Sequence, residues 1–181
     1  MPMSRYLNIS KISVGRVGFD MKRSVLCLIC LTVSSLLLTS CAKEMRGDLT
    51  CQEIGDEAIS AIGGDFAPMG EELLLLIFDG DAPYDDYAIY ASTPTEDIDE
   101  IGIFRAENRK DAERIAETLE EYVNETADGM RSFVASYAPE EAKKLDSVVT
   151  FVVGNYAVYM ILDKSDSEKV KARISECLTE D

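Results

Sequence analysis

The strongest constraint on the fold is a long stripe of apolar residues that ends at a proline. From Ala112 to Tyr137 the apolar residues recur at steps of three and four, which is the period of an α-helix of about 39 Å at 1.5 Å per residue. Asn108 can cap this helix, and Pro139 ends it. The stripe consists of Ala112, Ile115, Ala116, Leu119, Tyr122, Val123, Ala127, Met130, Phe133, Val134 and Tyr137. We expect its whole length, including Phe133, to face a core.

Two β-hairpins are predicted, one on each side of this helix in sequence. Residues 86–92 and 97–106 read as two strands joined by a loop that contains Thr-Pro. In the second hairpin, Gly154-Asn155 supplies the positive-φ residues that a two-residue turn needs. Residues 147–162 are apolar at nearly every position, which indicates central strands covered on both faces or one face kept for a partner.

Three shorter segments complete the predicted elements. Residues 50–62 form a helix that Gly63-Gly64 ends, residues 71–78 favour a helix over a strand, and residues 165–178 form a closing helix. The fold class that buries every apolar stripe is α+β. It is a four-stranded antiparallel sheet of two β-hairpins, each followed by a helix. The long helix packs across one face, and helices precede the sheet at the N-terminal side.

The segment "MKRSVLCLICLTVSSLLLTSCAK", Met21 to Lys43, has the parts of an export signal. Lys22 and Arg23 precede an apolar stretch of about 14 residues, shorter than the roughly 20 that a membrane span needs. Leu38-Thr39-Ser40-Cys41 resembles the bacterial lipobox, which implies lipidation of Cys41 after cleavage. We therefore interpret residues 1–20 as an over-extended gene start, 21–40 as a lipoprotein signal peptide, 41–49 as a tether and 50–181 as a single globular domain.

The net charge of the chain limits which classes of partner it can bind. Residues 41–181 contain 13 Lys and Arg against 33 Asp and Glu, a net charge of −20. Nucleic acid is excluded as a partner, because affinity for phosphates depends on clustered Lys and Arg. An anionic membrane surface would repel the domain, so the membrane contact is predicted to come from the lipid anchor. The remaining acidic surface is most simply solvated.

Cysteine and histidine usage limits the chemistry further. Cys27 and Cys30 leave with the predicted signal, and Cys41 carries the lipid. Cys51 and Cys177 remain, and in an exported chain they form either a disulfide between the first and last helices or two buried thiols. The chain has no His, which removes histidine-based nucleophilic dyads and zinc ligands.

Two acidic clusters are candidates for cation binding or for general acid/base catalysis. Asp79, Asp81, Asp85 and Asp86 offer oxygen ligands to a cation such as Ca²⁺, but their spacing departs from the EF-hand pattern, so an acidic loop is the preferred interpretation. The second acidic cluster lies within residues 96–100 and contains a carboxylate pair of the kind that general acid/base catalysis uses. That group is Glu96, Asp97, Asp99 and Glu100. The sequence shows no partner that would raise the pKa of one of these carboxyl groups, so a solvated loop is the preferred interpretation here too.

Three segments behind the lipobox carry a resemblance to a known family. "DIDEIGIF" (residues 97–104), "SFVASYAPEEAKKL" (132–145) and "VVGNYAVYMI" (152–161) resemble the bacterial lipoprotein family with domain of unknown function 4358. The resemblance covers roughly residues 50–178 and implies an exported location and the domain extent, but no activity. The chain departs from it at Leu73 to Phe78, where a more polar stretch with a Tyr is expected.

These observations favour a lipid-anchored, extracytoplasmic binding or protein-interaction module that is not an enzyme and needs no cofactor. Tyr84, Tyr87 and Tyr90 form the candidate binding surface, with an envelope protein, a peptide or a glycan as the partner. Two alternatives stay open: a hydrolase of envelope polymers that uses paired carboxylates, and a structural or assembly lipoprotein without a ligand.

Overall fold

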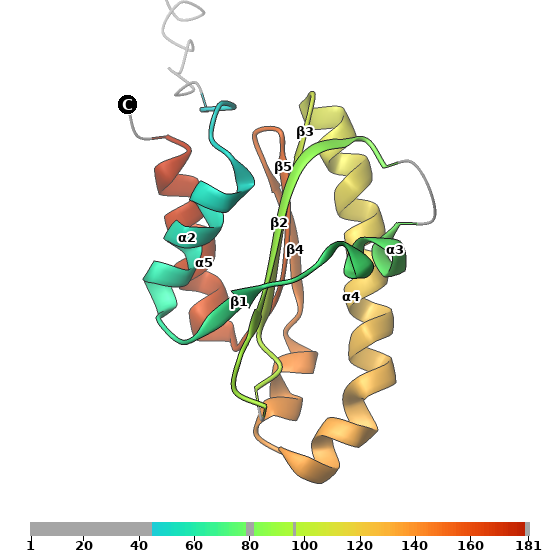
Figure 1. Cartoon of the computed structure of the whole chain (residues 1–181). Coiled ribbons are helices and arrows are strands. Elements are labelled where there is room, and N and C mark those ends of the chain that lie inside the picture. Colours follow the sequence, from blue (N-terminus) through green and yellow to red (C-terminus); the bar gives the residue numbers. More distant parts are fainter. Residues whose placement is uncertain (1–44, 79–81, 96, 180–181) are drawn as a thin grey trace, which may run out of the picture. The chain divides into compact units, whose positions relative to one another are not determined.

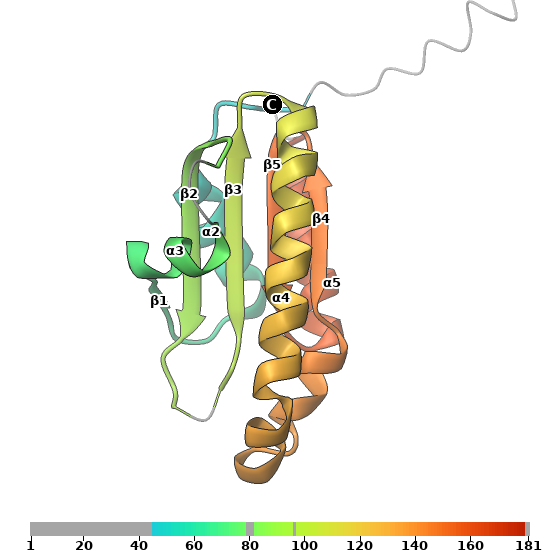
Figure 2. The same ribbon diagram turned by 90° about the vertical axis from the view of Figure 1, so that its right-hand side faces the viewer.

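An antiparallel sheet of five strands lies at the centre of the fold, in the order β1-β2-β3-β5-β4 (Figures 1 and 2). The structure is a computed structural model that describes residues 45–78, 82–95 and 97–179, and these residues belong to one compact unit, Lys43–Asp181. The strands are β1 (Phe66–Pro68), β2 (Tyr84–Ser92), β3 (Glu100–Ala106), β4 (Val149–Val153) and β5 (Tyr156–Ile161).

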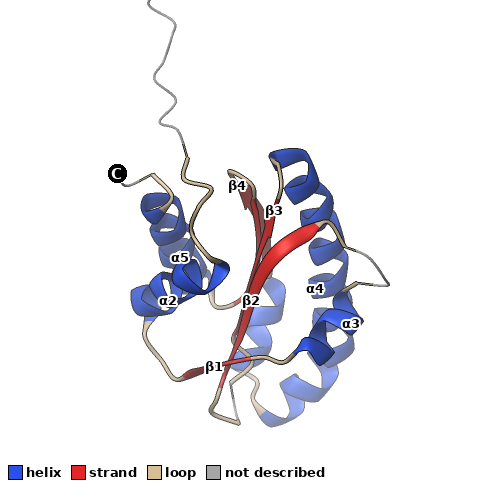
Figure 3. Ribbon diagram, turned by 45° about the horizontal axis from the view of Figure 1, so that its top comes forward, coloured by secondary structure: helices blue, strands red, loops and turns tan. Residues whose placement is uncertain are grey.

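Helices cover both faces of this sheet, which gives three layers (Figure 3). On one face α2 (Cys51–Ile62) packs beside α5 (Lys164–Cys177), and on the other lie α3 (Leu74–Ile77) and the long α4 (Arg109–Tyr137). The short 3-10 turns η1 (Glu71–Leu73) and η2 (Glu141–Asp146) precede α3 and β4. Each face has its own hydrophobic core, and β5 is buried along its whole length between them. The apolar second hairpin is therefore covered on both faces at β5.

The predicted class is confirmed at the level of an α+β fold with an antiparallel sheet and helices, but the strand count was wrong. The expected hairpins are β2–β3, followed by α4, and β4–β5, followed by α5. The missing strand is β1, three residues that pair with Tyr90 to Ser92 of β2. It escaped prediction because Phe66-Ala67-Pro68 is too short for a visible alternation, and its proline argues against a strand.

The long helix α4 has the predicted boundaries. The Asn108 side chain accepts a hydrogen bond from the backbone N–H of Asp111 at 3.1 Å, and Ala138 leaves the helical region with φ −139° before Pro139. The buried face was predicted incorrectly at its C-terminal end. Phe133 is 64 % exposed and Tyr137 is 78 % exposed, although their rings lie 4.7 Å apart.

Helix geometry explains the error at Phe133. Neighbouring residues lie about 100° apart around a helix, so Val134 and Phe133 cannot both point at the sheet, and Val134 is the buried one. A second correction concerns the β4–β5 turn. Gly154 has φ +59°, as expected, but Asn155 has no positive φ. Its side chain instead donates to the carbonyl of Ala106 at 2.8 Å.

Candidate functional site

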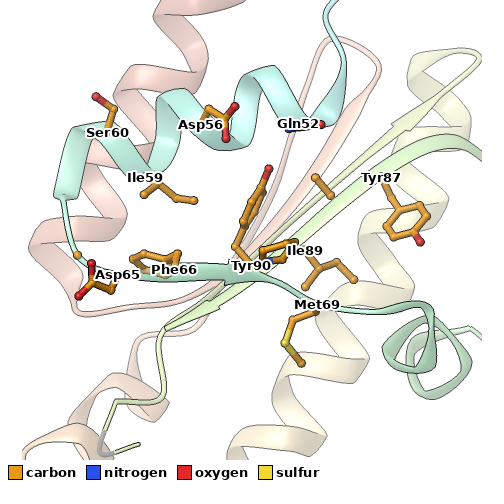
Figure 4. Close-up of a pocket in the computed structure, with 13 residues that line it drawn as sticks. Gln52, Asp56, Ile59, Ser60, Asp65, Phe66, Met69, Tyr87, Ile89 and Tyr90 are labelled. Carbon is orange, nitrogen blue, oxygen red and sulfur yellow. The ribbon is translucent and has the colours of Figure 1, made fainter. Parts of the chain in front are cut away.

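A hollow of about 710 Å³ lies between α2 and the edge of the sheet formed by β1 and β2 (Figure 4). We call it the α2–β2 groove. Its lining combines apolar side chains with a few polar ones, as binding sites commonly do. The groove is lined by Gln52, Asp56, Ile59, Ser60, Gly64, Asp65, Phe66, Pro68, Met69, Tyr87, Ala88, Ile89 and Tyr90.

Helix α2 forms one wall of the groove because of its sequence spacing. The groove-lining residues of this helix lie three or four positions from one another, so they are on one side of it. They are Gln52, Asp56, and the neighbouring pair Ile59 and Ser60. The helix begins at a capping box, in which Thr50 Oγ1 accepts from the N–H of Glu53 at 3.2 Å and Glu53 Oε2 accepts from the N–H of Thr50 at 2.8 Å. These hydrogen bonds fix the N-terminal end of α2.

Tyr90 forms the inner part of the groove and points from β2 toward α2, as Figure 4 shows. Its ring lies against Gly55 of α2, where an added Cβ would stand 2.3 Å from Tyr90 Cε2. Only glycine at this position lets the helix approach the ring so closely. Burial raises the pKa of the Tyr90 hydroxyl, and the nearby Asp56 carboxylate raises it further.

The outer edge of β2 is only partly covered by β1. The paired stretch is Tyr90 to Ser92, and the last contact is a hydrogen bond of 2.8 Å from the N–H of Met69 to the carbonyl of Ile89. After Met69 the chain turns into η1 and α3. In the described part of the chain, no strand therefore lies beside the outer edge of β2 from Tyr84 to Ala88.

The hydrogen bonds show which backbone groups point outward. The N–H of Thr93 donates to the carbonyl of Asp65, and the carbonyl of Ile89 accepts from Met69, so both residues direct backbone groups toward the β1 side. Successive residues of a strand alternate between its two neighbours. Tyr87, two residues before Ile89, therefore presents its N–H and C=O at the open edge.

Acidic side chains surround the groove. Asp56 and Asp65 are exposed on its lining, and among the described lining residues none is Lys or Arg. Burial raises the pKa of the Tyr87 hydroxyl, with the Glu71 and Glu72 carboxylates adding to the rise. The electrostatic surroundings of the groove are thus negative.

The three predicted tyrosines do not lie on one face of the sheet. Tyr84 and Tyr87 lie together on the α4 face, with ring centroids 5.7 Å apart, and pack against Phe104. Tyr90 lies on the opposite face under α2. The reason is the alternation of β2, which separates residues 87 and 90 onto opposite faces of the sheet. The predicted tyrosines lie on the strand that borders the groove, and the sequence did not reveal the wall that α2 provides.

The first acidic cluster is partly occupied by protein contacts. Asp85 accepts from Arg105 Nε at 2.9 Å, and Asp86 accepts from the N–H of Cys51, the first residue of α2, at 2.8 Å. Asp79 and Asp81 lie outside the described residues. Within the residues that the structure describes, no group of three or more potential metal ligands comes together.

The second acidic cluster is divided among three different contacts. Asp97 accepts from Ser92 Oγ at 3.0 Å, and Asp99 pairs with the half-buried Lys144. Glu100 accepts from the hydroxyls of Tyr159 at 2.6 Å and Tyr122 at 3.2 Å. Glu96 lies outside the described residues.

Glu100 is the titratable group that sequence reasoning underestimated. Burial raises the pKa of its carboxyl, while the two tyrosine hydrogen bonds oppose the rise. It borders a hollow of about 190 Å³ between β3 and α4. No local signal could have shown this, because Tyr122 and Tyr159 lie 22 and 59 residues away in sequence.

The two cysteines that remain after the predicted cleavage are both buried. Cys51 starts α2 and Cys177 ends α5, within one core cluster, and no disulfide joins Cys51 to Cys177. Burial strongly raises the pKa of the Cys51 thiol, which makes it a poor nucleophile. Cys41, the predicted lipidation site, lies outside the described residues. Within the described ranges no helix has the length and apolar character to cross a bilayer.

Comparison with known proteins identifies one family. The model described as "Domain of unknown function (DUF4358)" matches residues 80–162, which include β2, β3, α4, β4 and β5. No curated protein and no solved structure matches the chain. The match is shorter than the predicted resemblance, and it leaves out α2, β1 and α5. Residues 80–162 of the chain therefore match the DUF4358 domain.

Proposed function

We propose that this protein is a lipid-anchored, extracytoplasmic binding module, without enzymatic activity, whose binding surface is the α2–β2 groove. The observation that carries the proposal is the position of the groove beside a strand edge without a strand partner. Such an edge offers unpaired backbone donors and acceptors, which proteins usually cover or blunt. The lipobox before Cys41 supports an anchor that holds the module at the outer side of the cell membrane.

The carboxylate groups favour binding over hydrolysis. Glycosidases place two carboxyl groups about 5–9.5 Å apart on opposite sides of a substrate cleft. Here Asp99 is engaged by Lys144, and Glu100 is engaged by two tyrosines. Both are thus held by the protein itself, beside a hollow of about 190 Å³ that is much smaller than the α2–β2 groove.

A steric block of the groove tests the proposal. Ser60 is exposed on the α2 wall, so Ser60→Trp fills the groove without disturbing a core. The matched control is Ser132→Trp on the exposed side of α4. Both variants should keep the melting temperature of the parent protein. We expect Ser60→Trp to lose a partner that the parent protein and Ser132→Trp both capture from intact cells, and identical capture by all three proteins would refute the proposal.

A further inference from the structure

We propose that the partner enters the α2–β2 groove as an extended peptide segment rich in Lys or Arg, which pairs as an added strand with the outer edge of β2. This inference rests on the proposed function and specifies the chemistry of its partner. The added strand would continue the line of β1 beyond Met69, where β1 leaves the sheet. Strand addition of this kind takes its affinity from main-chain hydrogen bonds and its specificity from alternate side chains.

The backbone of β2 provides the first support. Tyr87 presents its N–H and C=O outward, two residues before Ile89, the last residue bonded on the β1 side. The neighbouring edge strand is less suitable, because Pro68 of β1 has no N–H to offer. In the described part of the chain, none of the three hollows of about 710, 320 and 190 Å³ is lined by a residue of the opposite edge strand, β4.

The groove provides the second support, because it lies on one face of the added strand. Alternate side chains of an extended peptide point to opposite faces, so every second one would enter the groove. There it would meet Ala88 and Tyr90, with Met69, which is 40 % exposed, at the border. Ile59 and Phe66 line the part of the groove beside β1, which pairs with Tyr90 to Ser92. The side chains between them would point toward Tyr87 and the α4 face.

Charge selects the class of peptide. Asp56 and Asp65 line the groove, and Glu71 and Glu72 act electrostatically on Tyr87 at the open edge. A Lys or Arg side chain can pass its apolar stem over the groove and place its charge beside these carboxylates. An acidic peptide would be repelled there, so charge gives specificity as well as attraction.

Binding is tested with synthetic peptides and the full chain purified in detergent. The probe is a fluorescent decapeptide of alternating Lys and Val, compared with a Glu–Val decapeptide and with two N-methylated Lys–Val peptides. One is methylated on odd residues and the other on even residues. Because a strand offers N–H groups to a given neighbour from alternate residues only, we expect one of the two to bind about tenfold more weakly and the other to change little. Equal losses for both, or equal binding of the Glu–Val peptide, would overturn the inference.

Two further measurements locate the site. Asp56→Asn with Asp65→Asn should weaken binding of the Lys–Val peptide, whereas Glu121→Gln with Glu125→Gln, which removes the same charge from α4, should not. Hydrogen exchange should slow on peptide addition in residues 84–89 and remain unchanged in β4. Equal weakening by the two double variants, or protection of β4 instead of β2, would show that the peptide binds elsewhere.

Peptide binding and partner capture, measured together, show which of the two proposals fails. If Ser60→Trp abolishes partner capture but the Lys–Val peptide does not bind, the groove is a binding site and strand addition is wrong. If the peptide does not bind and Ser60→Trp captures the partner normally, both proposals are wrong.

Discussion

Single residues in the sheet determine how side chains pack across neighbouring strands. Gly102 of β3 is paired with Tyr159 of β5, and an added Cβ would stand 2.0 Å from Tyr159 Cε1. The tyrosine ring therefore lies directly over the glycine and brings its hydroxyl to Glu100. Sequence patterns could not show this role of Gly102, because it depends on a ring 57 positions away.

Gly102→Ala should destabilise the protein by about 1–3 kcal/mol, since the added methyl group forces Tyr159 or the backbone to move. The matched control is Gly129→Ala in α4, where nothing lies within 4 Å of the added Cβ. That substitution should raise the free energy of unfolding by about 0.5–1 kcal/mol, because alanine loses less backbone entropy in a helix than glycine. Urea unfolding measures both, and effects of the same sign would contradict the packing described.

Glu100 should make a stability contribution that falls as the pH rises. Burial raises the pKa of its carboxyl above the ordinary value of 4.5, so the folded state keeps the proton to a higher pH than the unfolded chain. The contribution is fully present below about pH 4.5 and is lost as the pH passes through the raised pKa. The difference in unfolding free energy between the parent protein and Glu100→Gln should therefore decrease from acidic to neutral pH.

Tyr159→Phe provides a check on this titration. The Tyr159 hydroxyl lowers the pKa of Glu100, so its removal should move the pH-dependent loss of stability to higher pH. Stability differences that increase with pH in the Glu100 comparison would show that the carboxyl is not held in a desolvated site.

At the scale of elements, α4 shows which structural features a sequence can and cannot predict. Its N-cap at Asn108 and its end before Pro139 depend on local chemistry, and both were predicted correctly. The burial of its last two turns depends on which residues face the sheet there, and local spacing left two neighbouring candidates, Phe133 and Val134. Strand β1 was missed for a similar reason, because it exists only through its pairing with β2.

Alanine substitutions along α4 test the corrected orientation. Leu119→Ala should cost about 2–5 kcal/mol, because Leu119 is fully buried against the sheet. Phe133→Ala should change the unfolding free energy by about 0.5 kcal/mol or less, because Phe133 is exposed and contacts Tyr137 at the surface. Equal losses from the two substitutions, measured by thermal and urea unfolding, would indicate that α4 is rotated relative to the sheet.

At the scale of the whole molecule, the lipid anchor remains a prediction from residues 21–41. Intact-mass measurement after expression in a bacterial host should show a chain that begins at an acylated Cys41 and fractionates with membranes. Cys41→Ala should lose the acyl mass and the processing. A parent chain that begins at Met1 or Met21 and carries no lipid would end the lipoprotein interpretation.

The family match and the groove involve different parts of the molecule. Residues 80–162 supply β2 and the rest of the hairpin framework, whereas α2 and β1, which complete the groove, precede the matched segment. Sequence patterns could predict both hairpins because each is local. The groove could not be predicted, since it forms where three separate segments meet.

Site-specific photo-crosslinking in intact cells tests most directly whether the α2–β2 groove binds the partner. A photoreactive amino acid is placed at Met69, on the border of the groove, and in a second protein at Phe133, in the exposed aromatic pair on α4. We predict one adduct of discrete mass from position 69, reduced by Ser60→Trp, and no such adduct from position 133. An adduct from position 133 alone, or one from position 69 that Ser60→Trp leaves unchanged, would contradict a binding role for the groove.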